Sequence, residues 1–367
     1  MKPYSNFAVA RNELSSGLIE RDEEIDLVLC ALVAKEHVLL IGPPGSAKSL
    51  LLDSILKWMG GVKFAMLCTK FSVPEECFGP ISLAELKSDR YVRITTGKLP
   101  QADFAYLDEL FKASSAILNT LLRVLNERVF DAGDGAKKVP LKLCVAASNE
   151  WPPPETTKEL AALFDRFTFR KTVRPILTQA GRKRLLWDRN LVPVLSTTIT
   201  PIEVEAAHFE AMSLPWSKEA CEALETIIRE LAKEGIQPGD RRQVKAVSAA
   251  RAYAWLHGAE QVEPEHLEVL ASVLWDDPVE QPAKCAQVIA KVANPTGMRV
   301  NQFLLEVEQI LGGADVRDLT AAAKAAAKLA EIDRQLGGLK GNGRVEKARA
   351  YVKEQLKRLK LASLEAV

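Results

Sequence analysis

The sequence lacks long apolar runs, a strong net charge and paired cysteines. No apolar stretch approaches the roughly 20 residues that a membrane-spanning helix requires, so we expect no insertion into a membrane. Lys and Arg total 49 against 48 Asp and Glu, and this balance leaves no overall field that favours nucleic acid or anionic lipid. The six cysteines form no CxxC pair, and the N-terminus carries no signal-peptide pattern. We therefore expect reduced thiols and a cytoplasmic protein.

The first half of the chain alternates strand and helix patterns. With 367 residues, 47% of them hydrophobic, the chain is long enough for two or three domains. Short apolar runs bounded by turns predict buried strands at residues 38–41, 64–68, 104–107, 143–147 and 167–169. Helical patterns between them predict a parallel sheet covered on both faces. We expect an α/β domain over residues 1–175.

Helical patterns continue after the predicted strands end. Thr200 with the following proline resembles a helix start, as does the sequence VEP at residues 262–264, while Gly235 and Gly258 suit helix ends. These signals predict a helical domain over residues 176–277.

The remaining residues, 278–367, form a predicted helical extension. Two helical patterns, at residues 316–336 and 344–361, are separated by a segment rich in glycine, and residues 294–297 predict a turn. The two patterns predict an antiparallel helical hairpin.

The strand pattern at residues 38–41 runs directly into the sequence GPPGSAKS and then into a helical pattern. A strand, loop and helix in this order are the context of a phosphate-binding loop, in which backbone amides and the helix N-terminus attract anions. Lys48 is expected to reach the β- and γ-phosphates of ATP, and Ser49 to ligate Mg²⁺. The predicted nucleotide contacts in this segment are Gly42, Pro43, Pro44, Gly45, Ser46, Ala47, Lys48, Ser49 and Leu50.

Ala47 stands where this motif usually carries glycine. A methyl group is acceptable if Ala47 has helical dihedrals, which would leave the unusual backbone angles to Gly45. We therefore expect nucleotide binding to survive this departure. The alternative for the whole segment is a Gly-Pro turn before an ordinary helix.

Two adjacent acids, Asp108 and Glu109, end the strand pattern at residues 104–107. Following a phosphate-binding loop, such a pair resembles a Walker B motif. Asp108 is then expected to hold Mg²⁺ through its water shell, and Glu109 to orient and deprotonate the attacking water. Taken alone, the pair would be a solvated strand end.

Two further segments occur in the order seen in AAA+ ATPases. Residues 143–147 are followed by Ser148 and Asn149, which resemble sensor 1 and imply that Asn149 contacts the γ-phosphate or the attacking water. The sequence LFDRF at residues 163–167 resembles the segment that carries an arginine finger in MoxR-type proteins. The resemblance implies that Arg166 serves a neighbouring subunit. The alternative is an exposed pair between Asp165 and Arg166, which would contribute little.

The sequence PGDRR at residues 238–242 opens a helical pattern. Asp240 suits the N-cap, and Arg241 then falls in the first turn. Helix starts favour acids over paired arginines, so the pair resembles sensor 2, which reads the nucleotide phosphates from the lid. We favour Arg241 over Arg242 for this role. The alternative is a solvated arginine pair.

The resemblance to the MoxR group, and within it to the RavA-like ATPases, covers about residues 8–277. It implies a P-loop AAA+ core, with a parallel sheet flanked by helices, followed by an all-helical lid, and it places a β-hairpin at residues 126–139. It also implies ATP and Mg²⁺ as cofactors, a homo-oligomeric, hexameric ring, and chaperone-like remodelling of a partner protein with a von Willebrand factor A (VWA) domain. Two alternatives remain: a nucleic-acid remodelling ATPase, which the balanced charge disfavours, and a nucleotide-dependent scaffold with little turnover.

Overall fold

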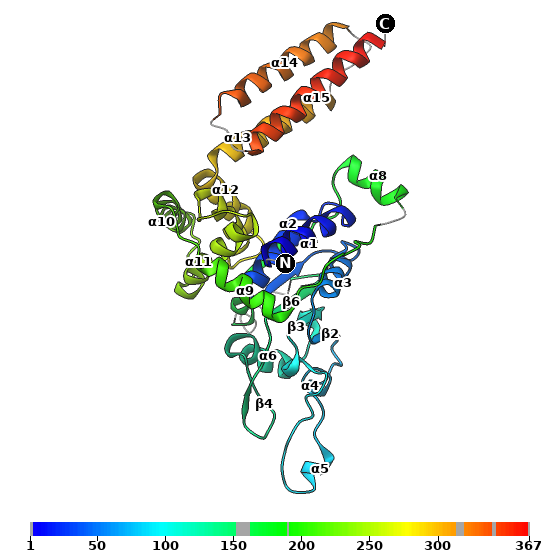
Figure 1. Ribbon diagram of the computed structural model, residues 1–367, viewed down its shortest axis with the longest axis vertical. Helices are drawn as coiled ribbons and strands as arrows, with labels where there is room; N and C mark the ends of the chain where they lie inside the picture. Colours follow the sequence, from blue (N-terminus) through cyan, green and yellow to red (C-terminus); the bar gives the residue numbers. More distant parts are fainter. Residues whose placement is uncertain (1–2, 152–161, 189–190, 313–318, 340–342, 366–367) are drawn as a thin grey trace. The chain divides into compact units, whose positions relative to one another are not determined.

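The computed structural model describes residues 3–151, 162–188, 191–312, 319–339 and 343–365. The chain divides into two compact units, residues 1–286 and 287–367, whose elements are labelled in Figure 1. The finer boundaries at residues 175 and 277 remain predictions. Within the described residues, no helix combines the length and the apolarity needed to cross a bilayer. All six cysteines are free, and Cys221 is the exposed one.

A parallel sheet of five strands, in the order β2-β3-β6-β1-β7, forms the centre of the first unit. The predicted strands are confirmed, although the last one begins slightly later in the chain than expected. Because all five are parallel, their carboxyl ends meet at one edge of the sheet and their amino ends at the opposite edge. The strands are β1 (Val38–Ile41), β2 (Lys63–Leu67), β3 (Phe104–Asp108), β6 (Leu143–Ser148) and β7 (Phe169–Thr172).

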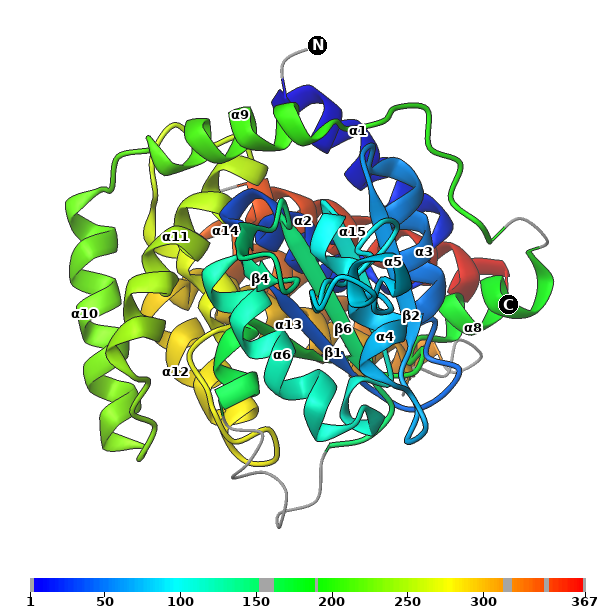
Figure 2. The same ribbon diagram turned by 90° about the horizontal axis from the view of Figure 1, so that it is seen from below.

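Helices cover both faces of this sheet, as the sequence predicted. Side chains of one face, such as Leu39 and Ala105, pack in one apolar core with the helices α4 and α6. Side chains of the other face, such as Phe104 and Val145, lie against α3. Figure 2 shows β1 and β6 side by side with α6 on the near side of the sheet. The bounds are α2 (Asp22–Ala34), α3 (Lys48–Trp58), α4 (Pro74–Phe78) and α6 (Ser115–Glu127).

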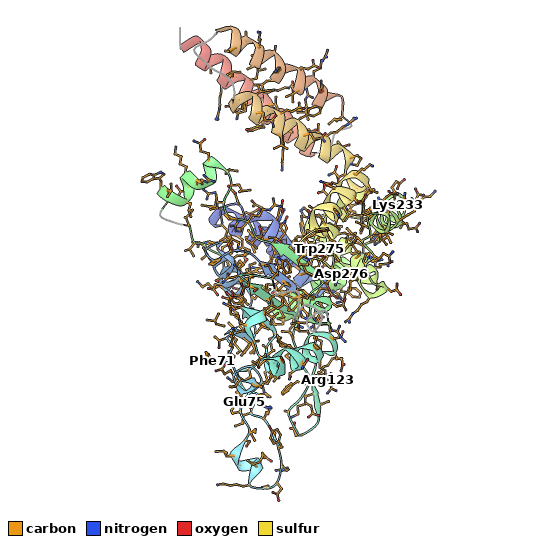
Figure 3. The ribbon with its side chains drawn as sticks, turned by 180° about the vertical axis from the view of Figure 1, so that it is seen from behind. Phe71, Glu75, Arg123, Lys233, Trp275 and Asp276 are labelled. Atoms are coloured by element: carbon orange, nitrogen blue, oxygen red, sulfur yellow. The ribbon has the colours of Figure 1, made fainter. Side chains whose placement is uncertain are left out.

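Two additions extend from this core. An antiparallel pair, β4 (Val129–Asp131) with β5 (Ala136–Lys138), confirms the hairpin expected before sensor 1. The segment between β2 and β3 carries α4 and α5 (Leu83–Leu86). Phe71, labelled in Figure 3, is 91% exposed in this segment.

The chain after β7 is helical in its described residues. Thr200 forms a complete capping box with Glu203, which confirms that helix start. The helix start expected at residues 262–264 is also confirmed, by a 3₁₀ helix that begins at Pro264 with Glu263 as its N-cap. One detail was wrong: the helix α11 takes its N-cap from Gly239, not from Asp240. The helices are α8 (Gln179–Trp187), α9 (Pro201–Met212), α10 (Lys218–Lys233), α11 (Asp240–Leu256) and η3 (Pro264–Ser272).

The N-terminal helix α1 (Pro3–Gly17) joins this helical part to the sheet. The ring of Phe7 packs edge-on against Trp58 of α3, with centroids 5.1 Å apart, and against Trp255 of α11, at 5.3 Å. All three side chains are almost completely buried. Edge-to-face aromatic pairs add to the energy of apolar burial, so these rings fix α11 relative to the core.

The second unit has a core of its own. Helices α14 (Leu319–Gly337) and α15 (Gly343–Glu365) form the predicted antiparallel hairpin, linked by an ion pair of 3.0 Å between Asp333 and Arg349. A third helix, α13 (Pro295–Gly312), packs on the hairpin through Val300 and Val307. The turn predicted at residues 294–297 lies at the junction of two helices. Helix α12 (Gln281–Ala293) ends before Asn294, and α13 begins at Pro295, because proline is tolerated in the first turn of a helix.

Candidate nucleotide site

The loop between β1 and α3 carries the predicted phosphate-binding residues. A Cβ atom on Gly42 would lie 2.4 Å from the carbonyl oxygen of Val173, so no larger residue fits there. Gly45 has a φ of +77°, which glycine adopts without strain. Lys48 begins α3, so the amides at the positive end of this helix border the loop. The local geometry is that of an anion site.

Ala47 does not have the right-handed helical dihedrals expected from the sequence. Its φ is 63° and its ψ is 22°, in the left-handed region. Left-handed backbone costs a residue with a Cβ about 1–2 kcal/mol. The expectation was wrong because it assigned all of the unusual geometry to Gly45, whereas the loop turns through both residues before α3 begins.

The strain at Ala47 leads to a stability prediction. We expect Ala47→Gly to raise the free energy of unfolding by roughly 0.5–1 kcal/mol, since the relief of strain exceeds the added freedom of the unfolded chain. Denaturant unfolding of the purified protein measures this. The control is Ala113→Gly, at a residue with a φ of −65°, which should destabilise. If both substitutions destabilise equally, the backbone at Ala47 is not strained.

Lys48, Glu109 and Asn149 form one hydrogen-bonded cluster. The ammonium group of Lys48 donates to the carbonyl of Gly42 at 2.6 Å and to Oδ1 of Asn149 at 2.9 Å. The side-chain amide of Asn149 in turn donates to Oε1 of Glu109. Burial lowers the pKa of Lys48, and the charges of Asp108 and Glu109 oppose this shift. Three predicted site residues from separate segments therefore meet at the carboxyl edge of the sheet.

The two acids lie where β3 ends. Glu109 has a φ of +53°, and its backbone N–H donates to Oδ1 of Asp108 at 3.0 Å. Nearby, the hydroxyl of Tyr106 donates to Oγ of Ser49 at 3.4 Å. Burial raises the pKa of Tyr106, and the neighbouring charge of Asp108 adds to that shift. Ser49 and Asp108 thus both lie close to Tyr106, beside the Lys48 cluster.

Arg166 lies at the other edge of the sheet. It precedes β7, and its Nη1 donates to the carbonyl of Ala162 at 3.3 Å and to Asp165 at 3.4 Å. Its Nε is buried, and no described residue forms a hydrogen bond with it. The pair between Asp165 and Arg166, which the sequence left as an alternative, is therefore present.

The arginines of α11 lie beside Arg166 instead of beside their own phosphate loop. Arg241 donates to Asp165 at 3.4 Å and also contacts Asn126. Arg242 is 3% exposed and donates to Asp165 at 3.3 Å. Asp165 thus accepts from three guanidinium groups.

Other contacts of α11 and the segment after it also place the start of α11 at the amino edge of the sheet. Lys245 of α11 donates to Glu36 at 2.6 Å and to Thr168 at 2.9 Å, residues that precede β1 and β7. Asp276, beside Trp275 in Figure 3, lies 3.4 Å from both Arg170 and Arg242. The first turns of α11 therefore lie along the amino edge of the sheet, opposite Lys48.

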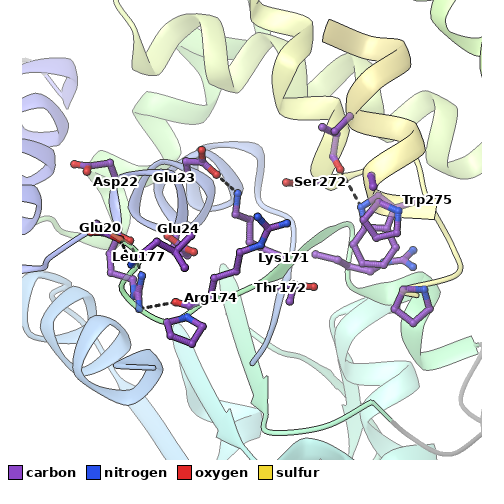
Figure 4. A pocket seen from close by; sticks show the side chains of 18 of the residues that line it. Glu20, Asp22, Glu23, Glu24, Lys171, Thr172, Arg174, Leu177, Ser272 and Trp275 are labelled. Carbon is purple, nitrogen blue, oxygen red and sulfur yellow. Dashed lines mark hydrogen bonds and ion pairs between the residues drawn. The ribbon is translucent and has the colours of Figure 1, made fainter. Parts of the chain in front are cut away.

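A cavity of about 440 Å³ borders the phosphate loop. Its lining is largely apolar and comes from the loop, from the segment before α2, from the segment after β7, and from α8. Sequence motifs did not reveal the lining of this cavity, because the segments that form it are far apart in the chain. A larger cavity of about 770 Å³, shown in Figure 4, contains no residue of the loop. The residues that line the 440 Å³ cavity include Leu18, Ile19, Gly45, Ala47, Ile176 and Leu186.

The fold defines the class of protein as AAA+. A crystal structure of an ATPase candidate from Cytophaga hutchinsonii superposes with a TM-score of 0.64 at 17% identity, covering 80% of this chain and 95% of that one. Residues 219–289 match an AAA lid domain.

The sequence comparisons define the family within this class. Residues 6–198 match the MoxR domain of the MoxR-vWA-beta-propeller ternary systems. An uncharacterised protein of Methanocaldococcus jannaschii is 39% identical over 303 residues, which cover 82% of this chain and 78% of that protein. Chaperone MoxR1 of Mycobacterium tuberculosis is 26% identical over 168 residues, covering 44% and 42% of the two chains. The chain belongs to the MoxR family of AAA+ proteins.

Proposed function

We propose that this protein binds ATP at the carboxyl edge of the sheet and hydrolyses it. The observation that carries the proposal is the cluster of Lys48, Glu109 and Asn149 at the start of α3. In this function Lys48 binds the β- and γ-phosphates. Glu109 takes a proton from the attacking water, while Asn149 orients that water or the γ-phosphate. The apolar cavity next to the loop is the site that we propose for the purine base.

The donor set fits Mg²⁺. Ser49 would offer a hydroxyl ligand, and Asp108 would offer a carboxylate that holds the ion through its water shell; both are the hard oxygen donors that Mg²⁺ prefers. Bound Mg²⁺ neutralises charge on the phosphates. Two residues of the chain would hold the ion: Ser49 from the start of α3, and Asp108 from the end of β3.

Removal of the metal tests this assignment. We expect EDTA to reduce phosphate release to background. Asp108→Asn should raise the Mg²⁺ concentration needed for half-maximal rate by about tenfold or more, since the carboxylate charge beside the ion is lost. A phosphate-release assay over a Mg²⁺ titration measures both. Asp53→Asn, an exposed acid on α3, is the matched control. An unchanged Mg²⁺ dependence in the Asp108 variant would contradict the role.

We further propose that each site is completed by a second copy of the chain. Arg166 and Arg241 lie at the opposite edge from Lys48 and therefore suit a neighbour's γ-phosphate better than their own. This differs from the sensor 2 role expected from the sequence, in which Arg241 contacts the nucleotide of its own subunit. The AAA+ class supports a six-membered ring as the assembly.

The cellular role that we propose is chaperone-like remodelling of a protein partner. The relative named Chaperone MoxR1 supports this class of activity, and the matched domain description supports a VWA protein as the partner. Co-purification with a VWA protein encoded nearby tests the partner directly. The RavA-like placement and the cytoplasmic location remain predictions.

A further inference from the structure

Arg21, which no sequence motif singled out, is buried behind the phosphate loop. It is 4% exposed. Its Nε and Nη2 donate to the carbonyl oxygen of Ser46 at 3.1 and 3.0 Å, and Nη2 also donates to the carbonyl of Arg174 at 2.9 Å. Nη1 donates to the carbonyl of Glu20 at 2.5 Å. Every guanidinium nitrogen is thus bound to the protein backbone, so the side chain holds the loop in place.

The bond to Ser46 determines the direction of the next amide. A trans peptide unit is planar, and its C=O and N–H point in opposite directions. Because Arg21 holds the carbonyl of Ser46 on one side, the N–H of Ala47 must point to the other. Ala47 is also the residue with left-handed backbone. A fixed carbonyl before it opposes relaxation into a commoner conformation.

We propose that Arg21 is a positioning residue for nucleotide binding: it stabilises the left-handed Ala47 and keeps the Ala47 amide turned toward the bound phosphates. The inference rests on the proposed nucleotide site and adds a residue outside its motifs. Arg21 is not a catalytic residue, since its contacts are with the backbone.

The adjacent Glu20 extends this support to the other side of the site. Its carboxylate accepts from the backbone N–H groups of Leu177 at 2.8 Å and Thr178 at 3.1 Å, near the labelled Arg174 in Figure 4. Thr178 caps α8, whose residues line the proposed purine cavity. Glu20 and Arg21 therefore join the phosphate loop to the wall of the base cavity.

The test is a double-mutant cycle between Arg21 and Ala47, read as the dissociation constant of mant-ADP with the full-length protein. Arg21→Met keeps the apolar stem and removes the donors. We expect it to weaken binding about tenfold, since hydrogen bonds to a charged group are lost. In the Ala47→Gly background the same substitution should weaken binding only about threefold, because glycine adopts the left-handed region unaided.

Controls separate this inference from the proposed function. Arg174→Met removes an exposed guanidinium and keeps the backbone acceptor, so its affinity should stay within about twofold. If Arg21→Met does not fold, as judged by circular dichroism, the cycle is run with Arg21→Lys, which cannot form the paired bonds. Equal affinity of wild type and variant, or an equal loss in both backgrounds, overturns the inference alone. Failure of wild type to bind mant-ADP overturns the proposed function and this inference together.

Discussion

Lys48→Ala is expected to abolish nucleotide binding, whereas Glu109→Gln should bind nucleotide and release no phosphate. The ammonium group of Lys48 is the cation at the centre of the loop, and loss of one partner of a buried charge pair weakens binding by about 100-fold or more. In the proposed reaction Glu109 acts on the attacking water, so Glu109→Gln should lower the rate by about 10² to 10⁴ while leaving the contacts of the nucleotide with the loop intact. Mant-ADP titration and phosphate release measure the two effects separately.

The control for the lysine is Lys57→Ala, an exposed lysine in the last turn of the same helix, which should change neither measurement. Equal mant-ADP affinity in wild type and the Lys48 variant would defeat the assignment of the loop. Substantial phosphate release by the Glu109 variant would remove this carboxylate from the role of general base and leave the binding site standing.

Mixing two inactive proteins is expected to restore activity. Arg166→Ala should lower hydrolysis by about 10³ to 10⁵, the range for an arginine supplied across a subunit boundary. Glu109→Gln is expected to be inactive for a different reason, the loss of the proposed general base. Where a subunit with intact Glu109 meets one with intact Arg166, a complete site forms. Phosphate release should therefore appear in the mixture although neither protein is active alone.

The matched control mixes Glu109→Gln with the double variant that carries Arg166→Ala as well. No subunit in that mixture has an intact Glu109, so activity should stay absent. Exchange of subunits is checked with fluorescently labelled chains. If the first mixture stays inactive although exchange is demonstrated, Arg166 does not act on a neighbour's nucleotide.

Most of the core could be predicted from the sequence because its signals are local. Short apolar runs between turns located the strands, and Lys48, Glu109 and Asn149 each follow one of them. In a parallel sheet, residues that follow the strands meet at the carboxyl edge. The positions of these three residues in the sequence were therefore enough to predict that they lie close together. The helix α13 was missed because Pro295 and Gly297 were interpreted as a turn, although both are compatible with the start of a helix.

The position of Arg241 could not be predicted in the same way. It depends on how α11 packs, and that packing is fixed by rings far apart in the chain, such as Phe7 and Trp255. Arg21 was missed for a related reason, since its acceptors belong to the backbone of Ser46 and Arg174 and leave no mark in the side-chain pattern. Sequence motifs located the residues to which we assign the proposed chemistry, and long-range contacts decide how these residues are held.

Ala47 and Glu109, on two different loops of the site, both have left-handed backbone. Strained residues persist where the surrounding structure holds them and where function needs them. Substitution by glycine would relieve the strain at either position, but at residue 109 it would also delete the carboxylate that the proposed reaction requires. Selection for thermal stability and selection for turnover would therefore act in opposite directions at residue 109. At residue 47 the two kinds of selection would not conflict, so a substitution of Ala47 by glycine could raise stability without loss of turnover.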